Sequence, residues 1–383
     1  MMDRSKQVPD SDWTTRRLVC LAGLPIDMID MAGALSRIRH AVSQRERLFL
    51  STPNLNFLIA AQKDAAFRES VLRSDLSVAD GMSLVIMGRI MGANLPERVT
   101  GSDLFEQLAL AKDHPPIKVF FFGGPPGAGE KAATRLNRDF SGVQCVGFHE
   151  PGYGDVESMS HPDVINQING SGADFVVVAL GAKKGQAWIL HNQQKLQAPV
   201  LSHLGAVINF MAGTVKRSPR WLQRMGLEWV WRIVQEPVLW KRYRDDGLAF
   251  ISLLIRNALP GVIVDRMTRS NTPKPASILR DTSTTSYREL SLAGAWDEAG
   301  AELIRTTLAN LQSSTVRLDL SEVSSIDTHA LGLFTGLHGR LLASGGQGVQ
   351  LHNAPKGVLR QIKTSGAGYL LDEHALNLVR MEA

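Results

Sequence analysis

The chain has 383 residues, of which 44% are hydrophobic and 21% are charged, and its formal net charge is +5 at pH 7. This length suffices for two domains, and the modest charge does not indicate a nucleic-acid-binding protein. The two cysteines, Cys20 and Cys145, have neither a zinc-ligand nor a disulfide-framework spacing, which fits a reducing compartment. The polar N-terminus lacks the apolar core of a signal peptide, and there is no run of about 18 apolar residues, so we expect no membrane-spanning helix.

Short apolar runs alternate with helical patterns through the first two thirds of the chain. We expect strands at residues 47–50, 118–122, 174–180 and 200–203, and helices within 55–73 and 130–137. These strands are rich in Val and Phe, and each ends at a glycine or a turn, which is typical of βαβ units. The sequence therefore predicts a Rossmann-like parallel sheet that binds ligands beyond the carboxyl ends of its strands.

The segment 217–244 combines four of the seven tryptophans with six arginines and one lysine. Indole favours the boundary between apolar and aqueous surroundings, and the planar arginine fork suits phosphate. The segment fits a surface that meets lipid phosphate at a membrane. It fits equally well an ordinary amphipathic helix with buried tryptophans and solvated arginines.

Composition changes after this segment. Residues 247–267 are largely apolar, and residues 270–286 are rich in Ser, Thr and Pro, which predicts a flexible linker. A second α/β unit follows, with strands expected at 289–292, 315–320 and 348–352 and helices at 298–311 and 330–344. We therefore divide the chain into a first domain at 14–246, an amphipathic segment with a linker at 247–286, and a second domain at 287–383.

Three segments of the first domain carry side chains suited to chemistry. Thr52 and Asn54 stand at a strand-to-helix turn, where they either bind a ligand or cap the helix, and on their own they favour the cap. Asp80 lies in what is most often a plain turn, but a carboxylate there also suits a general base. Arg98 can hold a phosphate, and residues 100–103 can cap the next helix.

Two glycines, Gly123 and Gly124, follow the strand at 118–122 and begin a turn that resembles a phosphate-cradling loop. No cluster of acidic residues suggests a metal site, and we expect no cofactor. A dinucleotide-dependent oxidoreductase is disfavoured because the chain lacks a G-x-G-x-x-G turn with an acidic residue further on.

Five motifs occur in a fixed order: Thr52-Pro53-Asn54, Asp80-Gly81, the stretch 96–104, Phe121-Phe122-Gly123-Gly124, and the stretch 217–229. Together they resemble the WecG/TagA/CpsF glycosyltransferase family over residues 18–243. The resemblance implies a nucleotide-sugar donor, commonly UDP-linked, and an undecaprenyl-diphosphate-linked acceptor at the cytoplasmic membrane. It also implies that no bound metal is required.

The resemblance assigns roles to individual residues. Asp80 is the implied catalytic base, Thr52 and Asn54 line the catalytic pocket, and Arg98 stabilises the donor diphosphate. The C-terminal arginines would close over the site and contact the lipid diphosphate or the membrane; they are Arg217, Arg220, Arg224 and Arg232. These roles agree with the chemistry of glycosyl transfer, which needs a base near the acceptor hydroxyl and positive charge near the departing diphosphate.

Two positions depart from the family pattern. Where the family commonly carries Pro-Lys-Gln-Glu, an ungapped alignment places Gly185 at the Gln and Gln186 at the Glu. Either Gln186 makes the substrate contact from a shifted turn, or that contact is absent. Where the family often has Phe-Asp, this chain has Ile208-Asn209, so a carboxylate is replaced by an amide that forms hydrogen bonds but is no base. The departures are compatible with a different donor sugar, weakened activity or a degenerate enzyme.

The second domain resembles a STAS domain, the fold of anti-sigma-factor antagonists, through residues 316–332. Many such domains carry a phosphorylatable hydroxyl at the start of a helix, where this chain has Asp327-Thr328-His329-Ala330. Thr328 is the remaining candidate for a regulatory phosphate. We nevertheless favour plain binding of a protein partner, with Thr328 as an N-cap.

The expected protein is α/β: a Rossmann-like parallel-sheet glycosyltransferase domain followed by a small STAS-type domain. The expected function is transfer of a sugar from a UDP-sugar to an undecaprenyl-diphosphate-linked saccharide in exopolysaccharide or other surface-polymer synthesis. The protein would be peripheral on the inner face of the plasma membrane, bound to its anionic surface. The alternative is a catalytically degenerate, membrane-bound scaffold whose STAS domain recruits partners.

Overall fold

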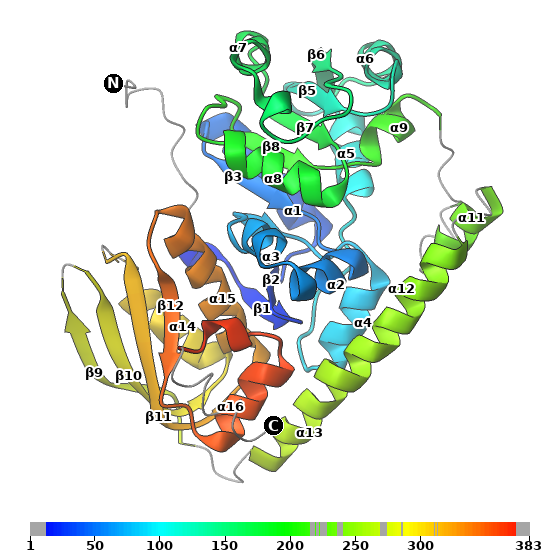
Figure 1. The fold of residues 1–383 in the computed structure, drawn as a ribbon. Helices are drawn as coiled ribbons and strands as arrows, with labels where there is room; N and C mark the ends of the chain where they lie inside the picture. The colour runs from blue at the N-terminus through cyan, green and yellow to red at the C-terminus, as the bar shows by residue number, and fades with distance from the viewer. Residues whose placement is uncertain are drawn as a thin grey trace.

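The computed structural model describes residues 13–214, 219, 222, 228–235, 240–268, 274–284, 286–309, 311 and 313–372. Two α/β units stand side by side, and a long helix runs along both of them (Figure 1). The first unit contains a six-stranded sheet, and the second contains a four-stranded sheet.

The six-stranded sheet has the order β4-β3-β8-β7-β5-β6, and all neighbouring strands are parallel, as predicted. The strands are β3 (Leu48–Ser51), β4 (Leu76–Ser77), β5 (Ile117–Gly123), β6 (Val143–His149), β7 (Phe175–Ala179) and β8 (Val200–His203). Helices cover both faces. Val119 and Phe121 of β5 therefore pack into one core cluster, and the alternate residues Phe120 and Phe122 pack into another. This double burial explains the uninterrupted apolar runs of the sequence.

The helices on one face are α1 (Met31–Gln44), α5 (Gly101–Leu110), α6 (Ala128–Asp139) and α9 (Val207–Met211). Those whose side chains pack against the other face are α7 (Pro162–Gly170) and α8 (Ala182–Asn192). The expected single helix at 55–73 is two helices, α2 (Leu55–Lys63) and α3 (Ala65–Leu72). The break falls at Asp64, whose side chain caps α3 by accepting the N–H of Phe67.

An antiparallel hairpin of β1 (Leu18–Leu21) and β2 (Leu24–Asp27) precedes the sheet. Its two-residue turn is Ala22-Gly23, and both residues have positive φ, at 48° and 84°. The hairpin packs with α2, α3 and α4 (Met82–Ile90) in a third apolar cluster. We did not predict this hairpin.

The four-stranded sheet has the order β12-β11-β10-β9. Its strands are β9 (Ser277–Ser283), β10 (Arg288–Trp296), β11 (Thr315–Ile326) and β12 (Gly348–His352), and its helices are α14 (Glu298–Thr307), α15 (Thr328–Ala343) and α16 (Lys356–Thr364). The linker interpretation of 270–286 is wrong for Ser277–Ser283, which forms the antiparallel edge strand β9 against β10. Most residues of β9 are exposed, so it shows no apolar alternation that the sequence could reveal.

The second unit is docked against the first by α15. Three glycines of α15 (Gly332, Gly336 and Gly339) lie where a Cβ atom would overlap atoms of β1 and of the end of α3. At Gly332 the added atom would lie 2.5 Å from Cα of Val19. The hydroxyl of Tyr369 donates to the carbonyl of Gly23 at 2.8 Å, and Arg17 forms an ion pair with Glu298. The two units therefore share a close-packed seam in addition to their covalent connection.

A long helix follows the first unit and comprises α12 (Trp240–Leu253), a π-helical stretch (Leu254–Ala258) and α13 (Leu259–Thr268). The expected boundary at 246 falls inside α12. Residues Arg244–Val264 are long and apolar enough to cross a membrane by length and composition alone, and the expectation that no helix spans the membrane stays a prediction. Polar residues such as Arg256 and Asn257 interrupt the apolar run, so a search for 18 consecutive apolar residues missed this helix. Asn257 of this helix bonds to the carbonyl of Thr364, and one side packs on the protein.

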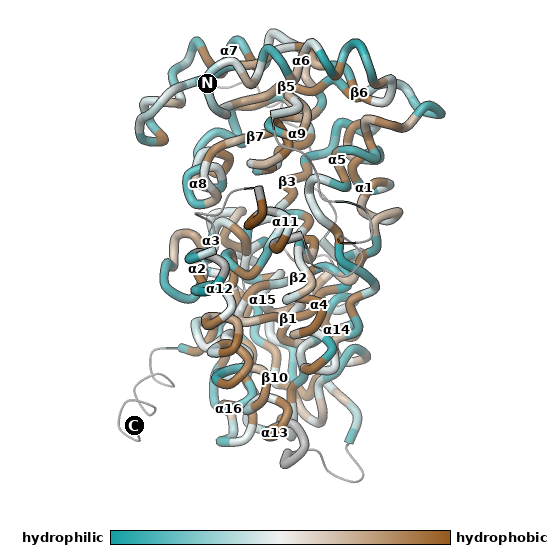
Figure 2. Tube along the Cα trace, turned by 90° about the vertical axis from the view of Figure 1, so that its right-hand side faces the viewer, coloured by the Kyte–Doolittle hydropathy of each residue, from teal (hydrophilic) through white to brown (hydrophobic). Residues whose placement is uncertain are grey.

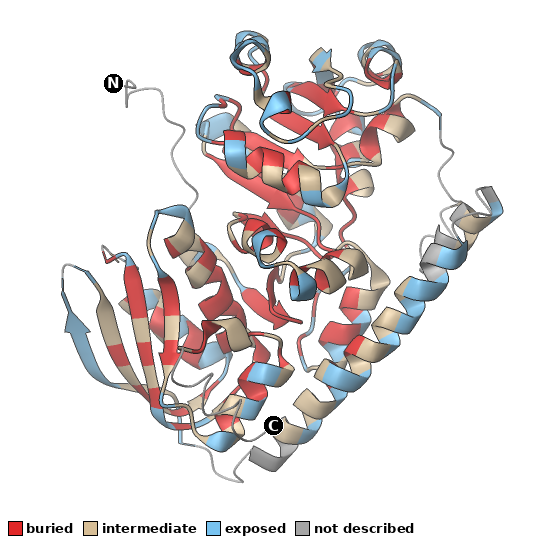
Figure 3. Ribbon diagram, viewed as in Figure 1, coloured by how far each residue is buried: buried red, intermediate tan, exposed pale blue. Residues whose placement is uncertain are grey.

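The other side of this helix carries apolar residues on the surface. Figure 2 shows hydrophobic residues recurring along it, and Figure 3 shows that much of the same helix is exposed. The exposed apolar side chains recur every three or four residues; they are Leu248, Ile251, Ile255, Leu259 and Ile263, and we call them the apolar stripe.

Candidate active site

Several predicted site residues of the first domain lie at the carboxyl edge of the six-stranded sheet. Thr52 directly follows β3, Asp80 follows β4, and Gly123 ends β5. The loops after β3 and β4 are tied together, because the N–H of Asp80 donates to the carbonyl of Pro53 at 2.8 Å. Ligands bind at this edge in parallel α/β sheets.

Asp80 lies against the start of α5. Its Oδ2 accepts the N–H of Gly101 at 3.4 Å, and Val99 donates to the carbonyl of Ala79 at 3.0 Å. These bonds hold the carboxylate between the loop after β4 and the positive end of the α5 dipole. Asp80 itself is only half-buried, so it remains accessible at the edge of the sheet.

Thr52 is buried beside the same helix terminus. A Cβ built on Gly101 would lie 3.3 Å from Cγ2 of Thr52 and 2.5 Å from Cδ2 of Leu204, so a larger residue there would have to displace the Leu204 side chain. The absence of a side chain at Gly101 lets α5 approach both β3 and β8. Thr52 and Asp80 therefore meet the same residue, which unites two of the sequence-predicted catalytic residues.

Asn54 is the N-cap of α2, since its Oδ1 accepts the N–H of Phe57 at 3.3 Å. The capping interpretation of this residue is confirmed. Its position one turn beyond β3 still places it at the candidate site, and its catalytic role stays a prediction.

Arg98 lies near the same helix start and forms an ion pair with Asp103, with 3.7 Å between Nη2 and Oδ2. The Arg98 side chain is 15% exposed. Asp103 is in the first turn of α5, where Thr100 caps the helix by accepting its N–H at 3.0 Å. The predicted cap in 100–103 is thus confirmed at Thr100, and Arg98 is held by ion pairing to the first turn of α5.

Gly123 and Gly124 shape the turn after β5. Both have positive φ, at 98° and 95°, and a Cβ on Gly124 would lie 2.8 Å from Cδ1 of Ile208. At the start of α6, however, the N–H groups of Gly127 and Gly129 donate to the carboxylate of Glu150 at 3.0 and 3.1 Å. A carboxylate of the protein thus occupies the donors that a phosphate would need, which contradicts the phosphate-cradling interpretation of this helix start. Substrate binding by the two glycines stays a prediction.

Gln186 is fully buried under the site. Its Nε2 donates to Oγ of Ser51 at 2.8 Å, and Ser51 Oγ lies 2.6 Å from Oγ of Ser74. The Gln186 side chain therefore supports the strand that leads into Thr52, and at zero exposure it does not reach the surface of the site. The sequence left two alternatives for Gln186: it contacts the substrate from a shifted turn, or the contact is absent. The buried position of the side chain favours the second alternative.

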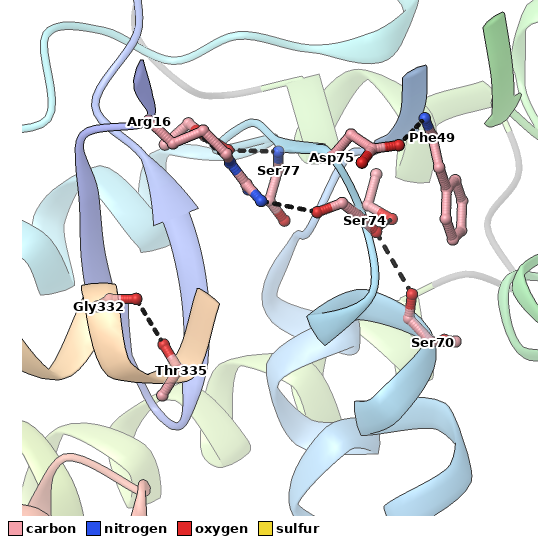
Figure 4. A network of polar contacts seen from close by, with 10 residues as sticks. Arg16, Phe49, Ser70, Ser74, Asp75, Ser77, Gly332 and Thr335 are labelled. Carbon is pink, nitrogen blue, oxygen red and sulfur yellow. Dashed lines mark hydrogen bonds and ion pairs between the residues drawn. The ribbon is translucent and has the colours of Figure 1, made fainter. Parts of the chain in front are cut away.

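Ser74 belongs to a wider polar network that also includes Arg16, Ser70 and Ser77 (Figure 4). Arg16 donates to the carbonyl of Ser74 at 2.8 Å and pairs with Asp27 at 2.7 Å. The same oxygen, Oδ2 of Asp27, also accepts the N–H of Ser77 at 2.6 Å. These contacts fix β4, which leads to Asp80, against the hairpin that meets the STAS-like unit.

His203 ends β8 at the same edge, and sequence reasoning missed it. Its Nε2 lies 2.5 Å from the carbonyl oxygen of Leu180, and its ring lies 6.4 Å from the ring of Phe57. Burial lowers the pKa of His203, which favours the neutral imidazole. A histidine at the end of an apolar strand was the signal available in the sequence.

The remaining predicted site residues lie elsewhere. Asn209 is half-buried on α9, next to the Ile208 that contacts Gly124. Arg217, Arg220 and Arg224 lie outside the described residues, as does the side chain of Arg232. Among the described residues, no group of three or more His, Cys, Asp or Glu could hold a metal ion.

Thr328 is 9% exposed and is the first residue of α15. The N-cap is Asp327, whose Oδ1 accepts the N–H groups of His329 at 2.8 Å and Ala330 at 3.1 Å. The N-cap assignment of Thr328 is therefore wrong by one residue. A carboxylate caps a helix as well as a hydroxyl does, and Asp327 precedes Thr328 by one position.

Comparison with known proteins agrees with the division into two units. The profile of the glycosyl transferase WecG/TagA/CpsF family matches residues 19–262, and that of the Mlab, STAS domain matches residues 281–372. The structure of the anti-sigma factor antagonist SpoIIAA in its unphosphorylated form is 25% identical; the match covers 27% of this chain and 97% of that chain, with a TM-score of 0.23.

Curated relatives match the first unit. Two N-acetylglucosaminyldiphosphoundecaprenol N-acetyl-beta-D-mannosaminyltransferases are similar to it. The one from Bacillus spizizenii is 29% identical over 226 residues, covering 57% of this chain and 85% of the relative. The one from Staphylococcus aureus is 25% identical over 226 residues, covering 58% of this chain and 86% of the relative. The chain therefore belongs to the WecG/TagA/CpsF glycosyltransferase family, and a STAS domain follows its transferase domain.

Proposed function

We propose that this protein transfers a sugar from a UDP-sugar to a saccharide carried on undecaprenyl diphosphate, in exopolysaccharide or other surface-polymer synthesis. The observation that carries the proposal is the position of Asp80, beside Thr52 and the start of α5, at the carboxyl edge of the parallel sheet. The relatives' names specify a lipid-diphosphate-linked acceptor and an N-acetylmannosaminyl group. The choice of donor sugar for this chain stays open to experiment.

Asp80 would act as the general base. As the acceptor oxygen forms a bond to the anomeric carbon, the bond from that carbon to the UDP oxygen breaks, and the hydroxyl proton passes to the carboxylate. The leaving group carries away the bonding electrons as negative charge on the diphosphate. Arg98 and the N-terminal end of α5 supply positive potential at the same edge of the sheet. We propose this transfer without a metal ion.

The protein would bind the inner face of the plasma membrane peripherally. The apolar stripe supports this proposal, because it is a row of exposed apolar side chains along one helix. At the start of this helix, Arg244 stacks over the ring of Trp240 at 5.3 Å, a combination suited to an interface that is both apolar and anionic. Such a surface would bring the site to a lipid-linked acceptor.

The rival function is a degenerate transferase that serves as a membrane-bound scaffold, with the STAS domain recruiting partners. The packing between the two units limits this scaffold function, because α15 of the STAS domain is already covered by β1 and α3 of the same chain. A partner would need another face of the STAS domain. We therefore favour the enzyme, with the STAS domain as a fixed part of it.

The deciding experiment measures transfer from a panel of UDP-sugars to a lipid-linked acceptor, with wild type and Asp80→Asn compared. The asparagine is isosteric but cannot accept the proton, so we expect turnover to fall by ~10²–10⁴ while the fold is retained. Asp113→Asn, at an exposed carboxylate, is the matched control. Wild-type protein that transfers no sugar would support the scaffold, and an Asp80→Asn variant with full turnover would remove Asp80 from the mechanism.

A further inference from the structure

The imidazole of His203 lies in a small cradle at the carboxyl edge of the sheet. The cradle consists of Gly185 on α8, Gly205 after β8, the carbonyl of Leu180 after β7, and the ring of Phe57 on α2. A Cβ on Gly185 would overlap Cδ2 of His203 and lie 3.0 Å from its Cγ. A Cβ on Gly205 would lie 3.2 Å from Nε2. The imidazole thus occupies the space that both glycines leave.

The cradle adjoins the candidate active site on two sides. Leu204, the next residue, contacts the position of Gly101 beside Thr52. Phe57, which meets the imidazole, is the residue whose N–H is capped by Asn54. His203 is therefore next to the groups that unite Thr52, Asp80 and Asn54, and it is only partly buried.

The contact with Leu180 places one proton of the ring on Nε2, and burial, which lowers the pKa of His203, favours the neutral form that carries no other ring N–H. A carbonyl oxygen only accepts, so the 2.5 Å contact places the proton of the neutral ring on Nε2. Nδ1 is then an acceptor, and it makes no hydrogen bond to any residue that the structure describes. Nδ1 of His203 is not among the buried side-chain atoms that lack a hydrogen-bond partner, so it reaches the surface of the site, where a ligand can donate to it.

We propose that Nδ1 of His203 accepts a hydrogen bond from a sugar hydroxyl of the substrate, so that His203 is a substrate-binding residue of the transferase. This inference rests on the proposed function. A neutral acceptor suits a hydroxyl and offers no positive charge to a diphosphate, so the ligand group is the sugar and not the pyrophosphate. The proposal also explains why position 185 is glycine, because a larger residue there would displace the imidazole of His203.

Two amide substitutions separate binding from a structural role. His203→Asn places an amide near the position of Nδ1, whereas His203→Gln places one near Nε2, where it can keep the bond to Leu180. We expect His203→Ala and His203→Gln to lower kcat/KM by roughly 10- to 100-fold, the size of one lost hydrogen bond to substrate, and His203→Asn to retain more activity. His191→Gln, at an exposed histidine of α8, is the control.

Separate titrations of the UDP-sugar and the lipid-linked acceptor identify which sugar is held, because only one of the two KM values should rise. Gly185→Ala should reproduce the defect of His203→Ala by moving the ring. Gly170→Ala, where an added Cβ meets nothing within 4 Å, should not. Activity preserved in His203→Ala, or rescued by His203→Gln rather than His203→Asn, would overturn the proposal. Wild-type protein inactive with every donor would instead refute the proposed function, and this inference with it.

Discussion

Nε2 of Gln186 and Oγ of Ser51 are 2.8 Å apart, which joins α8 to the end of β3 immediately before Thr52. Both residues are fully buried. The family alignment placed Gln186 at a substrate-binding position, but this bond makes it a support of the strand beneath the site. Oε1 of the same amide has no hydrogen-bond partner among the described residues.

Gln186→Ala should therefore destabilise the protein and affect turnover only indirectly. Removal of the amide leaves the buried hydroxyl of Ser51 with Ser74 alone, which costs about 1–3 kcal/mol. Urea unfolding should show this loss, with KM for both substrates close to wild type in the folded protein. A large rise in KM at unchanged stability would instead restore Gln186 as a binding residue.

Alanine at Gly332 of α15 should destabilise the seam. In an unobstructed helix, Gly→Ala stabilises by about 1 kcal/mol. Here the added Cβ would lie 2.5 Å from Cα and 2.6 Å from N of Val19, and backbone atoms cannot move aside cheaply. We expect a loss of about 1–3 kcal/mol or more, as for other overpacked sites.

The matched control for the seam is Gly247→Ala in α12, where an added Cβ meets nothing within 4 Å. It should be neutral or stabilising. Thermal unfolding of the two variants, together with proteolysis between the domains, compares the two effects. Equal stabilisation by both substitutions would show that α15 is not closely docked in solution.

The pH dependence of stability should reveal His329. The hydrogen bond and charge of Asp327 raise the pKa of His329, with Glu298 adding to the effect, and they outweigh the opposing effects of burial and of Arg17. Protonated His329 therefore stabilises the fold. This contribution is complete below the unfolded pKa of about 6.5 and is lost as the pH rises through the higher folded value.

The free energy of unfolding of wild type minus that of His329→Asn should thus be larger at pH 5.5 than at pH 8.5, values that bracket the unfolded pKa of about 6.5. Subtraction cancels the titration of the other groups. A difference that grows with rising pH would contradict the assigned direction.

The apolar stripe should govern membrane binding. Ile255 and Leu259 are 59% and 49% exposed, and insertion of each contributes roughly 1.5–3 kcal/mol when fully buried. Ile255→Glu with Leu259→Glu should lower the partition onto phosphatidylglycerol-containing vesicles by roughly 100-fold or more. Flotation measures the bound fraction.

Leu279→Glu is the control for flotation, because Leu279 is 61% exposed but lies on β9, away from the stripe. It should float like wild type. High salt should release part of the wild-type protein, since electrostatic attraction is screened and apolar insertion is not. Unchanged flotation of the stripe variant would leave the membrane proposal without its main support.

The sequence by itself determined the two domains, the parallel sheet and most of the motifs at its edge. Uninterrupted apolar strands such as β5 and β7 require cover on both faces, and this requirement is a local property of composition. The family resemblance also implied that Thr52, Asp80 and Arg98 share one site, and Thr52 and Asp80 do meet at Gly101 in the structure.

The tertiary structure alone decided which side chains already have partners. Glu150 occupies the amides at the start of α6 from 21 and 23 residues away, and Gln186 bonds to Ser51 across 135 residues. The docking of α15 on β1 depends on glycines that leave room for the backbone of a segment distant in sequence. The need for glycine at these positions can be recognised only in the folded structure. The pairing of Gly185 with His203 belongs to the same class. Such contacts depend on shape and distance between segments, and neither propensity nor periodicity encodes them locally.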